Sequence, residues 1–240
     1  MAHEAQLEFI NTMSKHLPQF FNNVRVLEIG SLDIKGTIRQ FYNNCEYTGI
    51  DVALGKGVDI VCQGQDYDIH DGYYDHVISC ECMEHNPYWL ETFLNMIRLC
   101  RPGGLITMTC AAIGRDEHGT ARTDHESSPL TVSIGWNYYK NLSENHFRKK
   151  IVFDEHFDLN RFWCNWSRSD LYFAGIKKQN DFSIDTQRKW TELESYYDKI
   201  NLFQNSTHRA KLREFVGTIF GDSGLRIAKK FKGQGERWPV

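Results

Sequence analysis

The stretch VRVLEIGSLDIKG, residues 24–36, carries the strongest indication of fold in this chain. Residues 24–30 form a short apolar run that stops at a glycine, which is typical of a buried strand followed by a turn. We expect a helix over residues 36–43. Polar or glycine-bearing segments then separate further strand-like runs, at residues 46–51, 57–62 and 74–80. This alternation predicts a parallel sheet built from βα units.

The pattern continues on both sides of this region. Residues 1–20 have apolar side chains at helical spacing, and Pro18 ends that helix. A helix is expected to begin at Asn86 and Pro87, because asparagine caps free N–H groups and proline is tolerated at the first helical position. The turn RPGG at residues 101–104 precedes a strand at 105–112, and two last strands are expected at 149–157 and 169–178.

Two segments between these elements stand out as functional candidates. Residues 113–129 are polar and longer than a usual connection in a compact domain. Residues 136–147 are expected to form a helix or a lid. Within it, Trp136, Tyr138 and Tyr139 either stack on a sugar ring or an aromatic acceptor, or pack as core residues.

The composition changes after residue 178, where two amphipathic helices are expected. We therefore divide the chain into a main domain, residues 1–178, and a helical extension, residues 179–240. The extension is expected to cover the acceptor pocket, form a homodimer contact or bind a partner. Its basic residues either meet a phosphate-bearing substrate or are simply solvated: Arg226, Lys229, Lys230, Lys232 and Arg237.

Composition excludes several classes of protein. With 240 residues, 41% of them hydrophobic and 25% charged, the chain fits a globular protein. A net charge of -3 argues against a nucleic-acid ligand held on a strongly basic face. No run is long and apolar enough for a membrane span, and no secretory signal begins the sequence. Seven cysteines without a CxxC pair suit reduced thiols, so a cytoplasmic location without structural zinc is expected.

Taken in order, these motifs resemble class I S-adenosylmethionine-dependent methyltransferases, in a type 11-like EIGSLDxxG form. Glu28-Ile29-Gly30 with Gly36 resembles the first motif, YDHVISCECMEH and RPGGLITMT the fourth and fifth, and FDEHF with DLYFAGIK the terminal hairpin. One strand and a glycine turn fit any nucleotide-binding α/β fold, whereas the ordered set, over residues 20–178, is specific. The loop reads GSLDIKG in place of GxGxG, and GxGxxG for NAD is absent.

The resemblance implies an α/β, Rossmann-like fold: a mainly parallel seven-stranded sheet with a terminal antiparallel hairpin, followed by C-terminal helices. It also implies S-adenosylmethionine as cofactor and S-adenosylhomocysteine as product. Asp51 would take the ribose hydroxyls and Gln63 with Gly64 would lie near the adenine. The full set of expected cofactor-binding residues is Glu28, Gly30, Ser31, Gly36, Asp51, Val52, Gln63, Gly64 and Cys80.

A hydroxyl acceptor must lose its proton during methyl transfer, which a positioned base or a metal assists. Glu81, Glu84 and His85 share one side if their turn is helical. This ExxEH element is similar to the metal site of small-RNA 2′-O-methyltransferases and to a motif of ubiquinone-pathway O-methyltransferases. The expected metal ligands, for magnesium, manganese or zinc, are Glu81, Glu84, His85 and His118, with His125 as an alternative to His118.

The alternative is that no metal binds and that Glu84 and His85 shape the turn or line the acceptor pocket. His118 or His125 then acts as the base, or is an ordinary loop histidine. The expected catalytic residues are Glu84, His85, His118 and His125. The EIGSLDxxG form resembles methyltransferases among glycan-modifying enzymes, so O-methylation of a sugar, nucleotide-sugar or glycan acceptor is expected. The alternatives are another small molecule methylated on nitrogen or oxygen, an RNA ribose 2′-hydroxyl, or a catalytically silent cofactor-binding partner.

Overall fold

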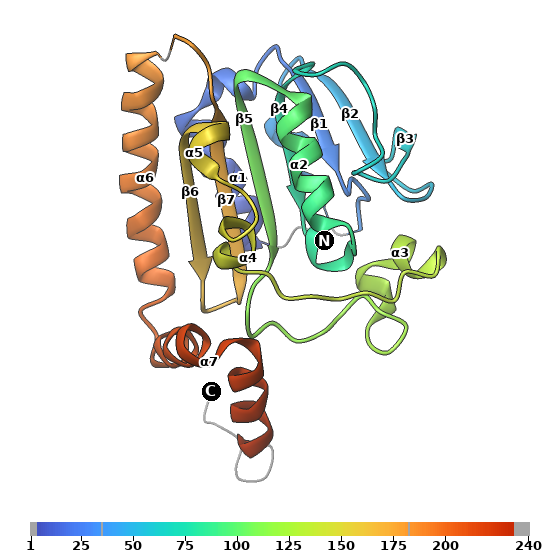
Figure 1. Cartoon of the computed structure of the whole chain (residues 1–240), viewed down its shortest axis with the longest axis vertical. Coiled ribbons are helices and arrows are strands. Elements are labelled where there is room, and N and C mark those ends of the chain that lie inside the picture. Colours follow the sequence, from blue (N-terminus) through green and yellow to red (C-terminus); the bar gives the residue numbers. More distant parts are fainter. Residues whose placement is uncertain (1–3, 35, 182, 233–240) are drawn as a thin grey trace.

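The computed structural model describes residues 4–34, 36–181 and 183–232, with side chains described as far as residue 227. Its centre is a seven-stranded sheet in the order β3-β2-β1-β4-β5-β7-β6 (Figure 1). The five strands from β3 to β5 are parallel, and β7 runs antiparallel to both of its neighbours. The strands are β1 (Arg25–Ile29), β2 (Glu46–Asp51), β3 (Ile60–Val61), β4 (Tyr74–Cys80), β5 (Cys100–Ala111), β6 (Phe157–Asn165) and β7 (Asp170–Lys177). The expected mainly parallel sheet with a terminal antiparallel hairpin is therefore confirmed.

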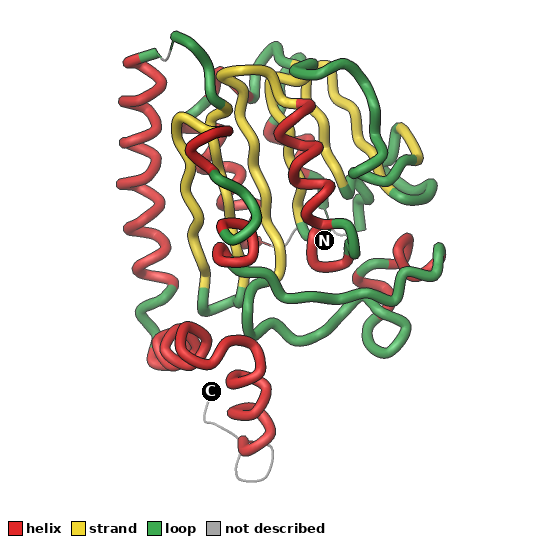
Figure 2. The backbone as a smooth tube through the Cα atoms, viewed as in Figure 1, coloured by secondary structure: helices red, strands yellow, loops and turns green. Residues whose placement is uncertain are grey.

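Helices cover both faces of this sheet (Figure 2). Helix α2 packs on one face and α1 on the other, and α6 runs beside α1 along the β6 edge. The helices are α1 (Glu4–His16), α2 (Trp89–Leu99), α3 (Pro129–Ser133), α4 (Glu144–Arg148), α5 (Phe153–His156), α6 (Ile184–Gln204) and α7 (His208–Lys232). Four short 3-10 helices lie between them: η1 (Pro18–Phe20), η2 (Ile38–Phe41), η3 (Met83–His85) and η4 (His125–Ser127).

Two apolar cores hold these layers together. Beneath α2, Phe93 contacts both Phe147 and Phe173 in edge-to-face arrangements. Beneath α1, the ring of Phe9 stacks on Tyr172 with 4.8 Å between centroids and meets Tyr197 of α6 edge-on. Helix α6 therefore belongs to the second core, although its residues lie outside the region that resembles methyltransferases. The division of the chain at residue 178 stays a prediction.

The sheet order places the functional edge. Between β1 and β4 the chain reverses the direction in which it adds strands, and in open α/β sheets ligands bind at such a point, outside the carboxyl ends of the strands. Residues 112–143 pass across this edge with little regular structure (Figure 2). They are fixed there by backbone hydrogen bonds from Lys140 to Glu84 and from Leu142 to Ala111.

Four expected elements differ in the structure. The helix over 36–43 is only the 3-10 turn η2, because a single side chain of that turn, Ile38, is buried, and so few residues cannot support an α-helix. The third strand is reduced to Ile60–Val61, whose side chains are exposed. The segment 136–143 is extended, and only residues 144–147 of the expected helix are helical, in α4.

The strand expected at 149–157 is also wrong, because residues 153–156 form α5 and the strand β6 begins only at Phe157. Phe153 and Phe157 are both buried and stack on each other, and their spacing of four residues is helical. Helix α2 begins at Trp89, three residues after Asn86, whose side-chain oxygen accepts a hydrogen bond from the N–H of Tyr88. The helix start is therefore organised by Asn86 without Asn86 being its cap.

The C-terminal helices have exposed apolar side chains. Helix α7 bends at Gly221, where φ is +62°, and Phe215, Ile219 and Phe220 are more than half exposed. Of the basic run near the C-terminus, only Arg226 has a described side chain, and it pairs with Asp222. No helix in the described ranges has the length and apolar character needed to cross a bilayer.

Candidate active site

The turn after β1 requires glycine at position 30. Gly30 has a φ of +81°, and a Cβ there would lie 2.6 Å from the Cβ of Cys82. The N–H groups of Gly30 and Ser31 both donate to the carbonyl of Ile50, at 2.9 and 3.1 Å. The ends of β1, β2 and β4 therefore meet closely, and glycine is the residue that permits this approach.

Asp51 lies at the end of β2, beside that turn. Its carboxylate accepts hydrogen bonds from the N–H of Leu32 at 3.1 Å and of Val52 at 2.8 Å. Burial raises the pKa of Asp51, and the two amide hydrogen bonds partly oppose this rise. The carboxylate is thus held in place by the glycine turn itself, at the position where the sequence predicts a ribose contact.

A small cavity lies between this edge and the segment that crosses it. It measures about 40 Å³, far below the roughly 300 Å³ at which ligand pockets begin. Leu130 and Thr131 of α3 form its outer wall. Its inner wall is formed by the sheet edge: Gly30, Leu32, Ile34, Asp51, Glu81, Cys82 and His85. In this conformation the cavity is too small for a nucleoside.

The other expected cofactor residues lie around this cavity without lining it. Glu28 is buried against Tyr47, and Cys80 belongs to the core beneath α1. The carbonyl of Gly64 accepts a hydrogen bond from Asn95, and the N–H of Gly36 donates to Asp33. Ser31 is buried, Gln63 accepts a hydrogen bond from Gln65, and Val52 contributes the amide already described. Their role in cofactor binding stays a prediction.

Glu84, His85 and His118 come together beside the cavity, and we call them the acid-histidine cluster. One ligand atom from each lies within 4.8 Å of the others. The rings of His85 and His118 meet edge-on with 5.0 Å between centroids. Glu84 and His85 come from η3 after β4, whereas His118 comes from the long segment after β5.

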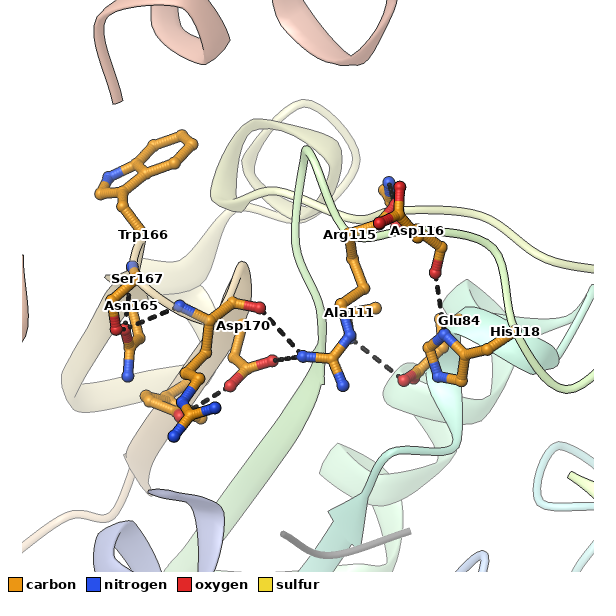
Figure 3. Close-up of polar contacts among 12 residues, drawn as sticks. Glu84, Ala111, Arg115, Asp116, His118, Asn165, Trp166, Ser167 and Asp170 are labelled. Atoms are coloured by element: carbon orange, nitrogen blue, oxygen red, sulfur yellow. Dashed lines mark hydrogen bonds and ion pairs between the residues drawn. The ribbon is translucent and has the colours of Figure 1, made fainter. Parts of the chain in front are cut away.

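The hydrogen bonds of this cluster define its chemistry. One carboxylate oxygen of Glu84 accepts from the N–H of Ala111 at 3.1 Å, as Figure 3 shows. The other carboxylate oxygen and Nδ1 of His85 are buried and have no partner in the described part of the chain. Nδ1 of His118 lies 3.0 Å from the carbonyl oxygen of Asp116. Because a carbonyl only accepts, Nδ1 carries the proton and Nε2 of His118 is left as an acceptor.

Burial sets the protonation of the cluster. It raises the pKa of Glu84 and, with the neighbouring His118, lowers that of His85 well below its usual value. Burial also lowers the pKa of His118. Both imidazoles are therefore neutral near pH 7, and a neutral imidazole is the form that accepts a proton or binds a metal.

Two residues predicted from sequence lie outside the cluster. Glu81 directly follows β4 and has a φ of +52°. The helical turn begins only at Met83, so Glu81 does not share a helical face with Glu84 and His85. It lines the cavity instead. His125 lies in η4 with an exposed side chain. Of the four expected metal ligands, the structure brings Glu84, His85 and His118 together and leaves Glu81 outside the cluster.

Two more residues lie at the cluster: Tyr139, which the sequence offered as a stacking or core residue, and Arg115, which it did not single out. Tyr139 packs against both His85 and His118, and its hydroxyl donates to the carbonyl of Asp116. Arg115 forms an ion pair with the fully buried Asp170 at 3.0 Å, in a row with Glu84 and His118 (Figure 3). Burial lowers the pKa of Arg115, but the charge of Asp170 and nearby carboxylates outweighs it, so the pKa is raised. The only sequence signal was its nearness to His118.

Comparison with known proteins identifies the fold. No protein-family model and no curated protein sequence matches the chain. Among solved structures, Haemonchus contortus phosphoethanolamine N-methyltransferase 2, in complex with phosphomonomethylethanolamine and S-adenosylhomocysteine, aligns with a TM-score of 0.50 and 16% identity. The alignment covers 70% of this chain and 53% of that one, so the chain spans about half of the Haemonchus protein.

A second similar structure is the Burkholderia thailandensis 1,6-didemethyltoxoflavin-N1-methyltransferase with bound 1,6-didemethyltoxoflavin and S-adenosylhomocysteine. It aligns at 14% identity and a TM-score of 0.49, over 72% of this chain and 77% of that one. The seven-stranded order, the terminal hairpin and the Haemonchus alignment together show the Rossmann-like fold of class I methyltransferases. At 14 to 16% identity, the similarity establishes only the fold, and any activity has to be argued from the residues of the site.

Proposed function

We propose that this chain is an S-adenosylmethionine-dependent methyltransferase that methylates a hydroxyl oxygen of a sugar-containing acceptor. The observation that carries the proposal is the position of the acid-histidine cluster, directly beside the cavity at the ends of β1, β2 and β4. His85 belongs to both and its ring meets that of His118, so two neutral imidazoles lie next to the proposed cofactor site. When bound, S-adenosylmethionine supplies an electrophilic methyl group on a sulfonium and leaves as S-adenosylhomocysteine.

The chemical groups at the cavity are of the types that bind this cofactor. Asp51 offers a fixed carboxylate for ribose hydroxyls, and Gly30 leaves the backbone open to close approach. The cavity itself is too small for the nucleoside, so α3 must move outward before the cofactor enters and close again to exclude water. We propose Gly30, Asp51, Glu81 and Cys82 as the binding edge.

His118 is the proposed catalytic base. With its proton on Nδ1, His118 would accept the proton of the acceptor hydroxyl at Nε2, which would leave the hydroxyl oxygen as the nucleophile for the methyl group that the bound cofactor would supply. The carbonyl of Asp116 fixes the imidazole in the required tautomer through Nδ1. Tyr139 packs against the ring and limits its rotation.

The test replaces two histidines of the same segment. His118→Asn should lower kcat about 100-fold or more, the usual contribution of a positioned base, while S-adenosylhomocysteine affinity changes only a few-fold. His125→Asn is the matched control and should keep activity, since His125 lies outside the cluster. Equal activity of both variants would assign the base elsewhere, and turnover on amines alone would favour nitrogen methylation. Cofactor binding without turnover on a broad acceptor panel would favour a silent binding partner.

A divalent ion held by the same cluster is a second candidate. Three donors lie within 4.8 Å, and two of their atoms, on Glu84 and His85, are buried without partners. Two imidazoles and one carboxylate favour zinc or manganese over magnesium. Such an ion would polarise an acceptor oxygen. Elemental analysis of the purified chain and of Glu84→Gln tests this, because a bound ion should be lost from the variant and removed by EDTA.

A further inference from the structure

A second pocket is lined by His118 and shares Ser127 with the cavity at the strand ends. It measures about 530 Å³ and is predominantly polar. Three segments distant in sequence build it: the segment after β5, the turn between β6 and β7, and the start of α7. Its lining includes four arginines, Arg115, Arg168, Arg209 and Arg213, and we call it the arginine pocket.

The arginines of this pocket differ from the other described arginines in their ion pairs. Thirteen of its arginines lie in the described ranges, and ten of them form an ion pair with a carboxylate. The three that do not are Arg168, Arg209 and Arg213, and all three line the arginine pocket. A random scatter of solvated arginines would not gather at one site in this way.

Arg213 shows how the charge is held. Its guanidinium donates to the carbonyls of Trp166 and Ser167, at 3.2 and 2.9 Å, which fixes its position without neutralising it. Burial, together with the charges of Arg209 and Arg115, lowers the pKa of Arg213 against the opposing effect of the Asp116 charge. The cations therefore repel one another here, and a bound anion would remove that repulsion.

The carboxylates of the pocket do not balance this charge. Glu117 forms an ion pair with Arg122, and Asp170 is engaged with Arg115. Asp116 is the other acidic residue of the lining, and its charge raises the pKa of Arg213, so it offsets part of the positive charge of the three arginines. Three serines also line the pocket: Ser127, Ser167 and Ser169. The buried hydroxyl of Ser169 has no hydrogen-bond partner in the described part of the chain.

We propose that the arginine pocket binds a phosphate or diphosphate group of the acceptor. Guanidinium groups match phosphate oxygens with paired N–H donors, and several of them converge here. His118 lines both the arginine pocket and the acid-histidine cluster, so an anchored phosphate places the rest of the acceptor beside the base. Anion binding stands on the pocket alone, whereas its assignment to the acceptor rests on the proposed function.

The first experiment uses inorganic pyrophosphate as the probe. Calorimetric titration into the whole chain, at constant ionic strength set with sodium chloride, should show saturable binding. Arg209→Gln and Arg213→Gln should each weaken it about tenfold or more, the loss expected for one charge-assisted hydrogen bond. Arg209 makes no ion pair in the described ranges, so its variant should fold normally. Arg188→Gln, on α6 and outside the pocket, is the matched control and should bind as the wild type does.

Two further measurements separate this proposal from the proposed function. S-adenosylhomocysteine should bind all variants equally, and phosphorylated acceptors should show a raised KM with Arg209→Gln while their unphosphorylated forms do not. Absence of pyrophosphate binding, or equal weakening by Arg188→Gln, would overturn the anion site. An unchanged KM for phosphorylated acceptors would overturn the acceptor assignment. Pyrophosphate binding without S-adenosylhomocysteine binding would keep the anion site and remove the methyltransferase.

Discussion

Replacing Glu28 with glutamine should remove a large pH dependence of stability. Glu28 is 5% exposed in β1, and one of its carboxylate oxygens accepts a hydrogen bond from the Tyr47 hydroxyl at 2.8 Å. Burial raises the pKa of Glu28 from 4.5 to about 7, against the lowering effects of the Tyr47 hydrogen bond and the Arg39 charge. The titratable or charged groups acting on it are Arg39, Tyr42, Tyr47, Asp51 and Cys80.

The sign follows from proton binding. The folded chain keeps the Glu28 proton up to about pH 7, whereas the unfolded chain loses it near pH 4.5. Glu28 therefore stabilises the fold fully below pH 4.5, and this contribution is lost as the pH rises to about 7. Each pH unit of that interval contributes about 1.4 kcal/mol, so the whole loss is about 3 kcal/mol. Glutamine does not titrate and still offers an oxygen to Tyr47.

Urea unfolding at several pH values between 4.5 and 8 measures this effect. The free energy of unfolding of the wild type minus that of Glu28→Gln should fall by about 3 kcal/mol across the range. Glu46→Gln, at the exposed start of β2, is the control, and its difference from the wild type should stay nearly flat. A wild-type minus Glu28→Gln difference that varies by less than about 0.5 kcal/mol would refute the assignment of the raised pKa to this carboxyl group.

Three further predictions concern the cofactor edge, the second core and the exposed helix. Gly30→Ala should weaken S-adenosylhomocysteine binding more than about tenfold in calorimetry, because its Cβ would meet Cys82 and the φ of +81° disfavours alanine; unchanged binding would place the cofactor elsewhere. Trp190→Ala should lower the free energy of unfolding by about 3 to 5 kcal/mol, whereas Phe203→Ala, 79% exposed, should change it by less than about 0.5 kcal/mol; equal losses would contradict the described core. We also expect Phe215→Ser to convert a homodimer into monomers of 28.1 kDa in sedimentation equilibrium, and a wild type already at 28.1 kDa would rule out that contact.

Local sequence patterns predicted the elements whose side chains are apolar along most of their length. The buried strands β1, β4 and β5 are near-continuous apolar runs, so their positions follow from the sequence. Helix α5 was missed because Ile151 and Phe153 alternate like strand residues, while the four-residue spacing of Phe153 and Phe157 determined the structure. Short segments of this kind are decided by tertiary packing.

The candidate site could likewise be predicted only in part from the sequence. Glu84 and His85 are adjacent in sequence, and their proximity to a later histidine was predictable from the order of motifs. Which histidine approaches them was not, because the path of residues 113–128 depends on contacts with Tyr139 and Asn141. The arginine pocket combines residues separated by about one hundred positions, so no local sequence pattern could predict it.

Asp222 has a consequence for the order in which the protein matures. Its carboxylate accepts hydrogen bonds from the N–H of Gly114 at 3.0 Å and from the side chain of Asn141 at 2.8 Å, so one residue of α7 joins both ends of the segment that crosses the sheet edge. A chain emerging from the ribosome builds its N-terminal elements first. The sheet is complete by residue 177, whereas the hydrogen bonds to Asp222 form only once residue 222 has emerged. The segment that crosses the sheet edge therefore gains its contacts with α7 only after the sheet beneath it has been synthesised.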